Sequence, residues 1–122
     1  MLKQLMSDYY NAYNAGDEAG LTALLAPEVT LVSDQGTIFG RAAYLDLYRQ
    51  MTSLFIDQMT PLDLKEDDDR VRVQIENTLT ARNDIADFMG MSLKAGGNII
   101  LQLKATYRFK NQQIMSIEIA II

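Results

Sequence analysis

The sequence predicts an α+β domain in which three N-terminal helices pack on a curved, mostly antiparallel sheet. Two patterns lead to this prediction. In the first half of the chain, apolar residues recur three and four positions apart, which is the spacing of amphipathic helices. In the second half, apolar and polar residues alternate, which is typical of strands with one buried face. The 122 residues are 48% hydrophobic and 22% charged, which fits a single globular domain spanning 1–122.

The helices are expected in the N-terminal half. The first is predicted over 2–13, and Gly16 favours the left-handed conformation that ends a helix. Asp17 is a good N-terminal cap for a second helix over 17–25. The third is predicted over 41–53. Because only these helices can cover the apolar faces of the strands, we expect the sheet to wrap around one of them.

The strands are expected between segments of turn residues. Pro61 has no amide hydrogen to donate, so the strand that contains it is expected at a sheet edge or at a bulge. The segment 82–97 contains three glycines and shows no period, so we expect irregular structure there. The predicted strands are 29–33, 37–39, 54–64, 70–81, 98–109 and 114–122.

The composition excludes several kinds of site. The chain has no Cys and no His, which removes disulfides, thiolate chemistry and the commonest metal ligand. Its net charge of -5 disfavours binding to nucleic-acid phosphates, and no apolar run is long enough to span a bilayer. The acidic run 67–69 lacks the spacing of a calcium loop. We expect a cytoplasmic protein without a signal peptide, cofactor, metal, nucleic-acid partner or membrane contact.

Several motifs resemble a known family. The segments YNAYNAGD at 10–17 and LTALLAPEV at 21–29, with the pair Gly40-Arg41, resemble the opening of the nuclear transport factor 2-like fold. The segments 87–91 and 107–118 are similar to its SnoaL-like polyketide cyclase branch, which is related to the ketosteroid isomerases. The resemblance implies a cone-shaped sheet around an internal pocket. Enzymes of this family place carboxylates and a tyrosine in that pocket and bind flat, apolar organic molecules.

The resemblance implies a role for a tyrosine and for a carboxylate. Tyr9 lies five residues before Asn14, where ketosteroid isomerase-like members keep a tyrosine that binds an oxyanion. Tyr9 also fits a packed residue on the apolar stripe of its helix. The general base of the isomerases aligns with Ser33. The adjacent Asp34 fits either a displaced base or an ordinary turn residue.

The acid that the family keeps is replaced in this chain. SnoaL-like cyclases and the isomerases have an acidic residue four positions before the last residue of an aromatic-Arg-Phe triplet. Here the triplet is Tyr107-Arg108-Phe109, and the position is occupied by Ala105. An alanine cannot transfer a proton. We therefore expect the family's acid/base catalysis to be lost.

Other residues are expected to contact a ligand. Asn77 interrupts an otherwise apolar strand face, so its amide either contacts the ligand or bridges backbone groups. Met89 and Met91 suit a pliable apolar lining and fit core packing equally well. The ligand-binding candidates are Tyr13, Asn77, Met89, Met91, Ala105 and Tyr107, beside the catalytic candidates Tyr9 and Asp34.

The outer face of the sheet is expected to be mixed in character. Glu118 is predicted to lie there and to pair with Lys104 or Arg108, rather than to act as a buried base. The apolar residues expected on the same face are Ile100, Ile114 and Ile122. A surface of this composition suits a homodimer.

Three functions are compatible with these observations. We expect first a binding module that holds a small hydrophobic organic molecule in an apolar pocket, because Ala105 replaces the family acid. The alternative is a cofactor-independent cyclase or isomerase that uses Tyr9 and a displaced carboxylate. A further alternative is a non-catalytic domain that dimerises through the outer sheet face. An ionisable acid in the pocket would favour the enzyme over the binding module.

Overall fold

The computed structural model describes residues 2–122, and within them the chain forms three helices and eight strands. The helices are α1 (Leu2–Ala15), α2 (Glu18–Leu24) and α3 (Arg41–Leu54). The strands are β1 (Leu25–Ser33), β2 (Gly36–Phe39), β3 (Phe55–Asp67), β4 (Arg70–Ala81), β5 (Ile85–Phe88), β6 (Met91–Leu93), β7 (Asn98–Lys110) and β8 (Gln113–Ile121). The α+β class is confirmed, and each predicted helix and strand has a counterpart.

The boundary between α1 and α2 forms for the local reasons expected from the sequence. Gly16 adopts a φ of 70°, which is the left-handed conformation that ends α1. The carboxylate of Asp17 accepts a hydrogen bond from the amide of Gly20 at 3.0 Å and caps α2. No helix among the described residues has both the length and the apolar character needed to cross a membrane.

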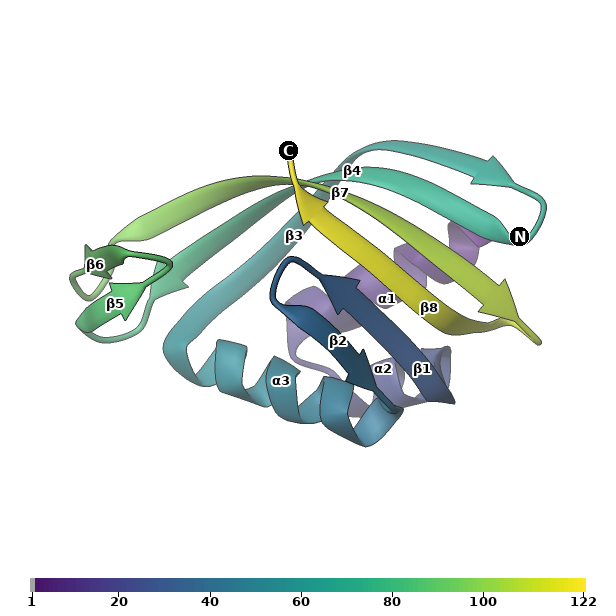
Figure 1. The fold of residues 1–122 in the computed structure, drawn as a ribbon, viewed down its shortest axis with the longest axis horizontal. Coiled ribbons are helices and arrows are strands. Elements are labelled where there is room, and N and C mark those ends of the chain that lie inside the picture. Colours follow the sequence, from purple (N-terminus) through teal and green to yellow (C-terminus); the bar gives the residue numbers. More distant parts are fainter. Residues whose placement is uncertain (1) are drawn as a thin grey trace.

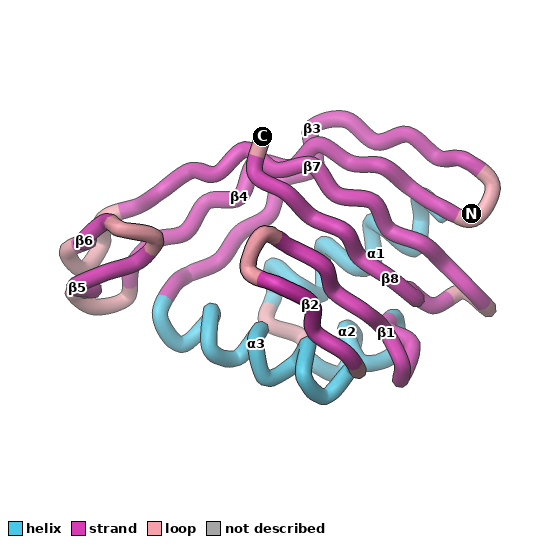
Figure 2. The backbone as a smooth tube through the Cα atoms, viewed as in Figure 1, coloured by secondary structure: helices cyan, strands magenta, loops and turns pink. Residues whose placement is uncertain are grey.

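A six-stranded sheet arches over α1 and α3 (Figure 1). Its strand order is β2-β1-β8-β7-β4-β3, and a separate two-stranded sheet is formed by β5 and β6. Only the β1–β8 pair in the larger sheet is parallel, so the sheet is mostly antiparallel as predicted. Strands therefore form one layer and helices the other (Figure 2). Pro61 lies on edge strand β3 beside a register shift, as its missing amide hydrogen requires.

The core lies between the helices and the concave face of the sheet. All six tyrosines of the chain are buried there, together with aliphatic residues of β4, β7 and β8. A second, smaller cluster surrounds Phe55 and Leu79. Phe88 of β5 packs edge-on against Phe55, with ring centroids 4.8 Å apart. This contact joins the small sheet to the body of the molecule.

The segment 82–97 is more regular than predicted. It folds into the hairpin of β5 and β6, whose turn contains Met89 at a φ of 53° and Gly90 at a φ of 81°. Strands of four and three residues are too short to show a period in the sequence. Their hairpin is stabilised by the tertiary contact of Phe88, which the sequence does not reveal.

The prediction for Ile114 was wrong. Its side chain is fully buried rather than on the outer face, with a relative exposure of 0%. The tight β7–β8 turn has positive φ at Asn111 and Gln112, and the register shifts directly after Phe109 pairs with Ile114. A bulge of this kind reverses the alternation of side chains along a strand. Ile114 and Ile117 therefore both face the core.

The prediction of an ion pair for Glu118 was also wrong. Glu118 lies on the outer face and is exposed, as expected, but the register places it opposite Thr106. Lys104 and Arg108 instead oppose Ala120 and Ser116. Within residues 2–122, no basic side chain reaches the Glu118 carboxylate.

Candidate functional site

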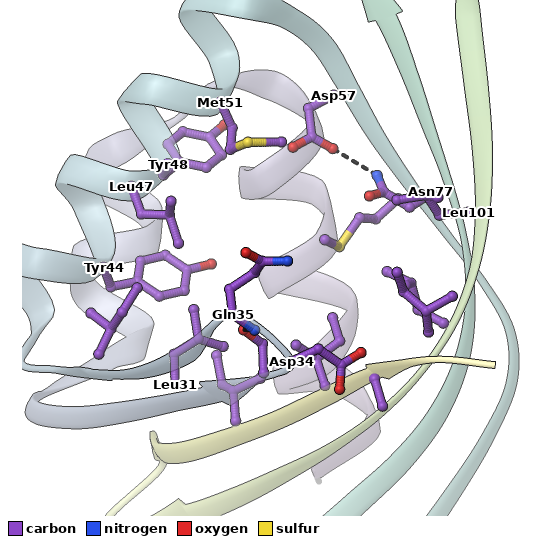
Figure 3. A pocket seen from close by; sticks show the side chains of 18 of the residues that line it. Leu31, Asp34, Gln35, Tyr44, Leu47, Tyr48, Met51, Asp57, Asn77 and Leu101 are labelled. Atoms are coloured by element: carbon purple, nitrogen blue, oxygen red, sulfur yellow. Dashed lines mark hydrogen bonds between the residues drawn. The ribbon is translucent and has the colours of Figure 1, made fainter. Parts of the chain in front are cut away.

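A cavity of about 640 Å³ lies between α1, α3 and the concave face of the sheet. Tyr44, Tyr48 and other side chains of α3 form one wall, and Asp57 and Asn77 from the sheet face them across the space (Figure 3). Most of the lining is aliphatic or aromatic. A volume of this size suits a small organic molecule.

The cavity lining includes the buried carboxyl of Asp57, which is only 5% exposed. The hydroxyl of Tyr13 donates to Oδ2 at 2.7 Å, and Nδ2 of Asn77 donates to Oδ1 at 2.7 Å. Figure 3 shows the bond between Asn77 and Asp57. Burial raises the pKa of Asp57, and the two donors offset part of that increase. We call Tyr13, Asp57 and Asn77 the acid triad.

Backbone pairing and one amide side chain position the acid triad. Asp57 shares the inward face of β3 with Phe55 and Met59. Met59 pairs with Asn77 across β3 and β4, which brings the amide of Asn77 beside Asp57. The side chain of Asn14, at the end of α1, donates to the carbonyl of Met59 and accepts from its amide, both at 2.8 Å. These two hydrogen bonds fix the end of α1, and with it Tyr13, against β3.

The tyrosine hydroxyls of the cavity are also paired. Tyr9 and Tyr44 share a short hydrogen bond, and the Tyr10 hydroxyl donates to that of Tyr107 at 3.1 Å. Burial raises the pKa of each of these phenols, and that of Tyr107 to about 12. All four are therefore neutral near pH 7. The Tyr9–Tyr44 pair has two hydroxyl protons and uses one between its members, so the other proton can be donated to a ligand.

Two hairpins form the mouth of the cavity. The β1–β2 turn contributes Asp34 and Gln35, and the side chain of Gln35 extends toward the middle of the space (Figure 3). The β5–β6 hairpin contributes Asp87 and Met89. The side chains of Asp34 and Asp87 are exposed, in contrast to Asp57. The cavity thus has one buried carboxyl and two carboxyls in contact with water.

Six of the eight predicted site residues line this cavity, namely Tyr9, Tyr13, Asp34, Asn77, Met89 and Tyr107. Asp34 belongs to the β1–β2 turn and also lines the cavity. Its position in the turn is therefore compatible with both roles expected for it, a turn residue and a displaced base. Asn77 bridges to the backbone, as one of its alternatives stated, because Nδ2 also donates to the carbonyl of Gln58 at 3.0 Å. The functional roles of these residues stay predictions.

The other two predicted ligand contacts lie outside the lining of this cavity. Met91 is exposed on β6 and lies outside the lining. Ala105 is buried on the concave face but packs into the core rather than against the cavity. Met91 was expected to contribute to a pliable apolar lining, and Ala105 was expected at the position of the family acid. The turn at Met89 and Gly90 separates Met91 from Met89, and the core side chains around Ala105 cover it.

The sequence reasoning missed Asp57, Tyr44 and Tyr48 in the cavity wall. A signal for Asp57 was present, because strict alternation from Phe55 to Met59 places it on the inward face. Asp57 also overturns the argument drawn from Ala105. The cavity contains a carboxyl from another strand, and the hydroxyl of Tyr9 lines the same space. The expected loss of acid/base chemistry therefore does not follow.

The donor set of the cavity is suited to proton transfer. Among residues 2–122, no three acidic side chains are arranged to hold a metal ion. The acid triad instead combines a carboxyl of raised pKa with two neutral donors. A carboxylate of this kind can accept a proton from a bound molecule.

Comparisons with known proteins give a consistent picture of the fold. Residues 6–117 match the model of the SnoaL-like domain. A candidate polyketide cyclase from Xanthomonas campestris pv. campestris superposes with a TM-score of 0.83 at 23% identity, covering 97% of this chain and 87% of that chain. IdmH, a candidate polyketide cyclase from Streptomyces antibioticus, gives a TM-score of 0.80 at 18% identity over 98% of this chain and 90% of that chain.

A further similar structure is an epoxide hydrolase. The LEH-like enzyme from M. tuberculosis gives a TM-score of 0.79 at 12% identity over 98% of this chain and 80% of that chain. A search of curated proteins returned no significant match. At these identities the structural matches establish the fold alone. Proteins named for different reactions share it.

Proposed function

Because this chain belongs to the SnoaL-like domain family, we propose that it is a cofactor-independent acid/base enzyme whose proton-transferring group is Asp57. The observation that carries the proposal is the acid triad inside an apolar cavity. The class of reaction we propose is proton removal from a carbon beside a carbonyl group, in a small hydrophobic molecule. Cyclases and isomerases begin in this way.

The buried carboxyl has the properties that this step requires. Each oxygen of Asp57 accepts one hydrogen bond from the protein and keeps a further lone pair for a ligand. Burial raises the pKa of the carboxyl, which makes its ionised form a stronger base. Tyr13 and Asn77 hold it in place, so they are positioning residues.

The phenols complete the proposed step. When the C–H bond breaks, the proton moves to Asp57 and the electron pair moves to the carbonyl oxygen of the substrate. The spare proton of the Tyr9–Tyr44 pair supports donation of a hydrogen bond to that oxygen. Return of the proton to another carbon gives isomerisation, and attack of the enolate on a second carbonyl gives ring closure.

Solvent deuterium exchange tests this proposal without knowledge of the natural substrate. We expect the protein in D₂O to exchange the acidic C–H protons of a 3-keto-Δ5-steroid or an aryl 1,3-diketone, as followed by NMR. Asp57→Asn should reduce the exchange rate by about 10²-fold or more, because general-base catalysis contributes that much. The matched control Asp34→Asn changes an exposed acid of the same cavity.

The control variant should keep the rate within about twofold, because exposed groups away from the reacting atoms contribute little. Circular dichroism checks that both variants are folded. Equal rates in Asp57→Asn and in the unchanged protein would contradict the proposal, as would the absence of exchange with every carbon acid tested.

Pairing of two copies through the outer sheet face is a separate proposal. Ile100 and Ile122 support it, because they are 54% and 66% exposed on or beside this face. Ile114 no longer supports it, since it is buried. Sedimentation of the unchanged protein and of Ile100→Lys should give a dimer and a monomer respectively. A monomeric unchanged protein would exclude this pairing.

A further inference from the structure

The charges around the cavity all have one sign. Asp57 lies inside, and Asp34 and Asp87 lie at the mouth on two different hairpins. Of the residues that the structure describes, no Lys or Arg contributes to the lining, and the chain has no His. A cavity with walls of low dielectric constant concentrates the field of such charges.

The arginines of neighbouring elements are directed elsewhere. Arg41 at the start of α3 donates to the carbonyls of Thr22 and Leu25. Arg49 of the same helix pairs with Glu18 at 2.7 Å. Arg82, after β4, donates to backbone carbonyls. These contacts direct their positive charges away from the cavity, so they do not neutralise its carboxylates.

The aromatic lining adds to this preference. Five tyrosines and Phe88 contribute to the cavity wall, and the face of an aromatic ring attracts a cation. Since burial raises the pKa of the phenols, they stay neutral near pH 7 and add no negative charge that would compete with the carboxylates. Carboxylates and ring faces both stabilise a positive charge and repel a negative one.

We propose that the cavity selects its substrate by charge and takes a hydrophobic molecule that carries a protonated amine, which lies at the mouth between the β1–β2 turn and the β5–β6 hairpin. Asp34 and Asp87 are the acids that recognise the amine. The apolar part of the molecule fills the interior, and its reacting carbon lies at Asp57. This inference rests on the proposed function only in placing the reacting carbon. Molecules with a carboxylate or a phosphate in place of the amine should bind more weakly.

Three ligands of similar shape test the charge preference. They are the amine 2-(2-naphthyl)ethylamine, the alcohol 2-(2-naphthyl)ethanol and the carboxylate (2-naphthyl)acetate. Calorimetric titration at low salt should give a Kd for the amine about tenfold lower than that for the carboxylate, since each mouth acid attracts one ligand and repels the other. The Kd of the alcohol should lie between them. The difference should shrink in 1 M NaCl, because both mouth acids are exposed and therefore screened.

The double variant Asp34→Asn/Asp87→Asn identifies the acids responsible. We expect it to reduce the ratio of the two Kd values several-fold and to leave the Kd of the alcohol unchanged. Equal or tighter binding of the carboxylate to the unchanged protein would overturn the inference. A ratio that survives in the double variant would also overturn it, because the mouth acids would then not recognise the amine.

The inference and the proposed function fail in different experiments. Asp57→Asn should reduce deuterium exchange by about 10²-fold or more, and it should retain a preference for the amine, because Asp34 and Asp87 are still present. The double variant should lose most of the charge preference. Charge preference without any exchange would refute the enzyme and support the binding preference. Deuterium exchange without a charge preference would support the enzyme and refute the binding preference.

Discussion

Asp57 and Asp34 are carboxylates of the same cavity, and they differ in almost every physical respect. Asp57 is buried, accepts hydrogen bonds from Tyr13 and Asn77, and has a raised pKa. Asp34 is exposed at a turn. The comparison shows that the chemistry of a carboxyl in this fold depends on which element presents it. Strand β3 takes its acid into the core, whereas the β1–β2 turn keeps its acid in water.

The largest effect on stability should follow from removing a partner of Asp57. Asn77→Leu keeps the size of the side chain and deletes the donor to Oδ1 and to the carbonyl of Gln58. We expect the free energy of unfolding to fall by about 2–3 kcal/mol, because the buried carboxyl of Asp57 and the carbonyl of Gln58 each lose a hydrogen bond. Urea unfolding measures this change.

The control for this variant is Gln74→Leu. Gln74 is exposed on the outer face of the same strand, so the free energy of unfolding should change by less than about 0.5 kcal/mol. A loss of similar size in both variants would mean that the acid triad has no special contribution to stability. It would also weaken the contrast between the buried and the exposed acid.

The pH dependence of stability should separate the two carboxyls further. The pKa of Asp57 is raised in the folded state above its ordinary value of 3.8, so the folded state holds this proton to higher pH than the unfolded state. The free energy of unfolding should therefore fall as pH rises from about 4 through the raised pKa. Asp57→Asn should lack this decrease.

The measurement is urea unfolding of the unchanged protein and of Asp57→Asn from pH 4 to pH 8. The difference between their free energies of unfolding isolates Asp57 from the other carboxyls. As pH rises, the unchanged protein should lose stability relative to Asp57→Asn. A constant difference, or one that moves in the opposite direction, would show that the burial of Asp57 is offset by its donors.

The smallest effect should come from Asp34. Because its side chain is exposed, Asp34→Asn should change the free energy of unfolding by less than about 0.5 kcal/mol. Thermal unfolding at pH 5 and pH 7 should show the same small difference from the unchanged protein. A destabilisation comparable to that of Asn77→Leu would mean that the β1–β2 turn depends on this carboxylate and is not only the mouth of the cavity.

Most of the fold could be predicted because its determinants are local or periodic. Gly16 and Asp17 end one helix and begin the next through their own backbone and side chain. The alternation along β4 assigns Val71, Val73 and Ile75 to the core. The burial of Ile114 could not be predicted in this way, since the register shift between Arg108 and Phe109 is a property of two strands together.

The candidate site could be predicted only in part for the same reason. Tyr9 was proposed from the family resemblance, and Asn77 was proposed because it interrupts a periodic apolar face. Asp57 lies on such a face too, but the resemblance implied the family acid at the position of Ala105 and gave Asp57 no role. The hydrogen bonds of Asp57 join residues that are 44 and 20 positions away in the chain. No spacing rule within one element relates residues so far apart.

By itself, the sequence determined that this chain folds as helices on a curved sheet and that neither thiol nor imidazole chemistry is available to it. Those conclusions depend on residue type and short-range spacing, which act through local backbone preferences and apolar burial. Only the tertiary structure decided that a carboxyl would enter the cavity, which donors would hold it, and that no Lys or Arg of residues 2–122 would line the space. These properties arise when distant strands and helices pack together, because desolvation and hydrogen bonding depend on what surrounds a group in three dimensions.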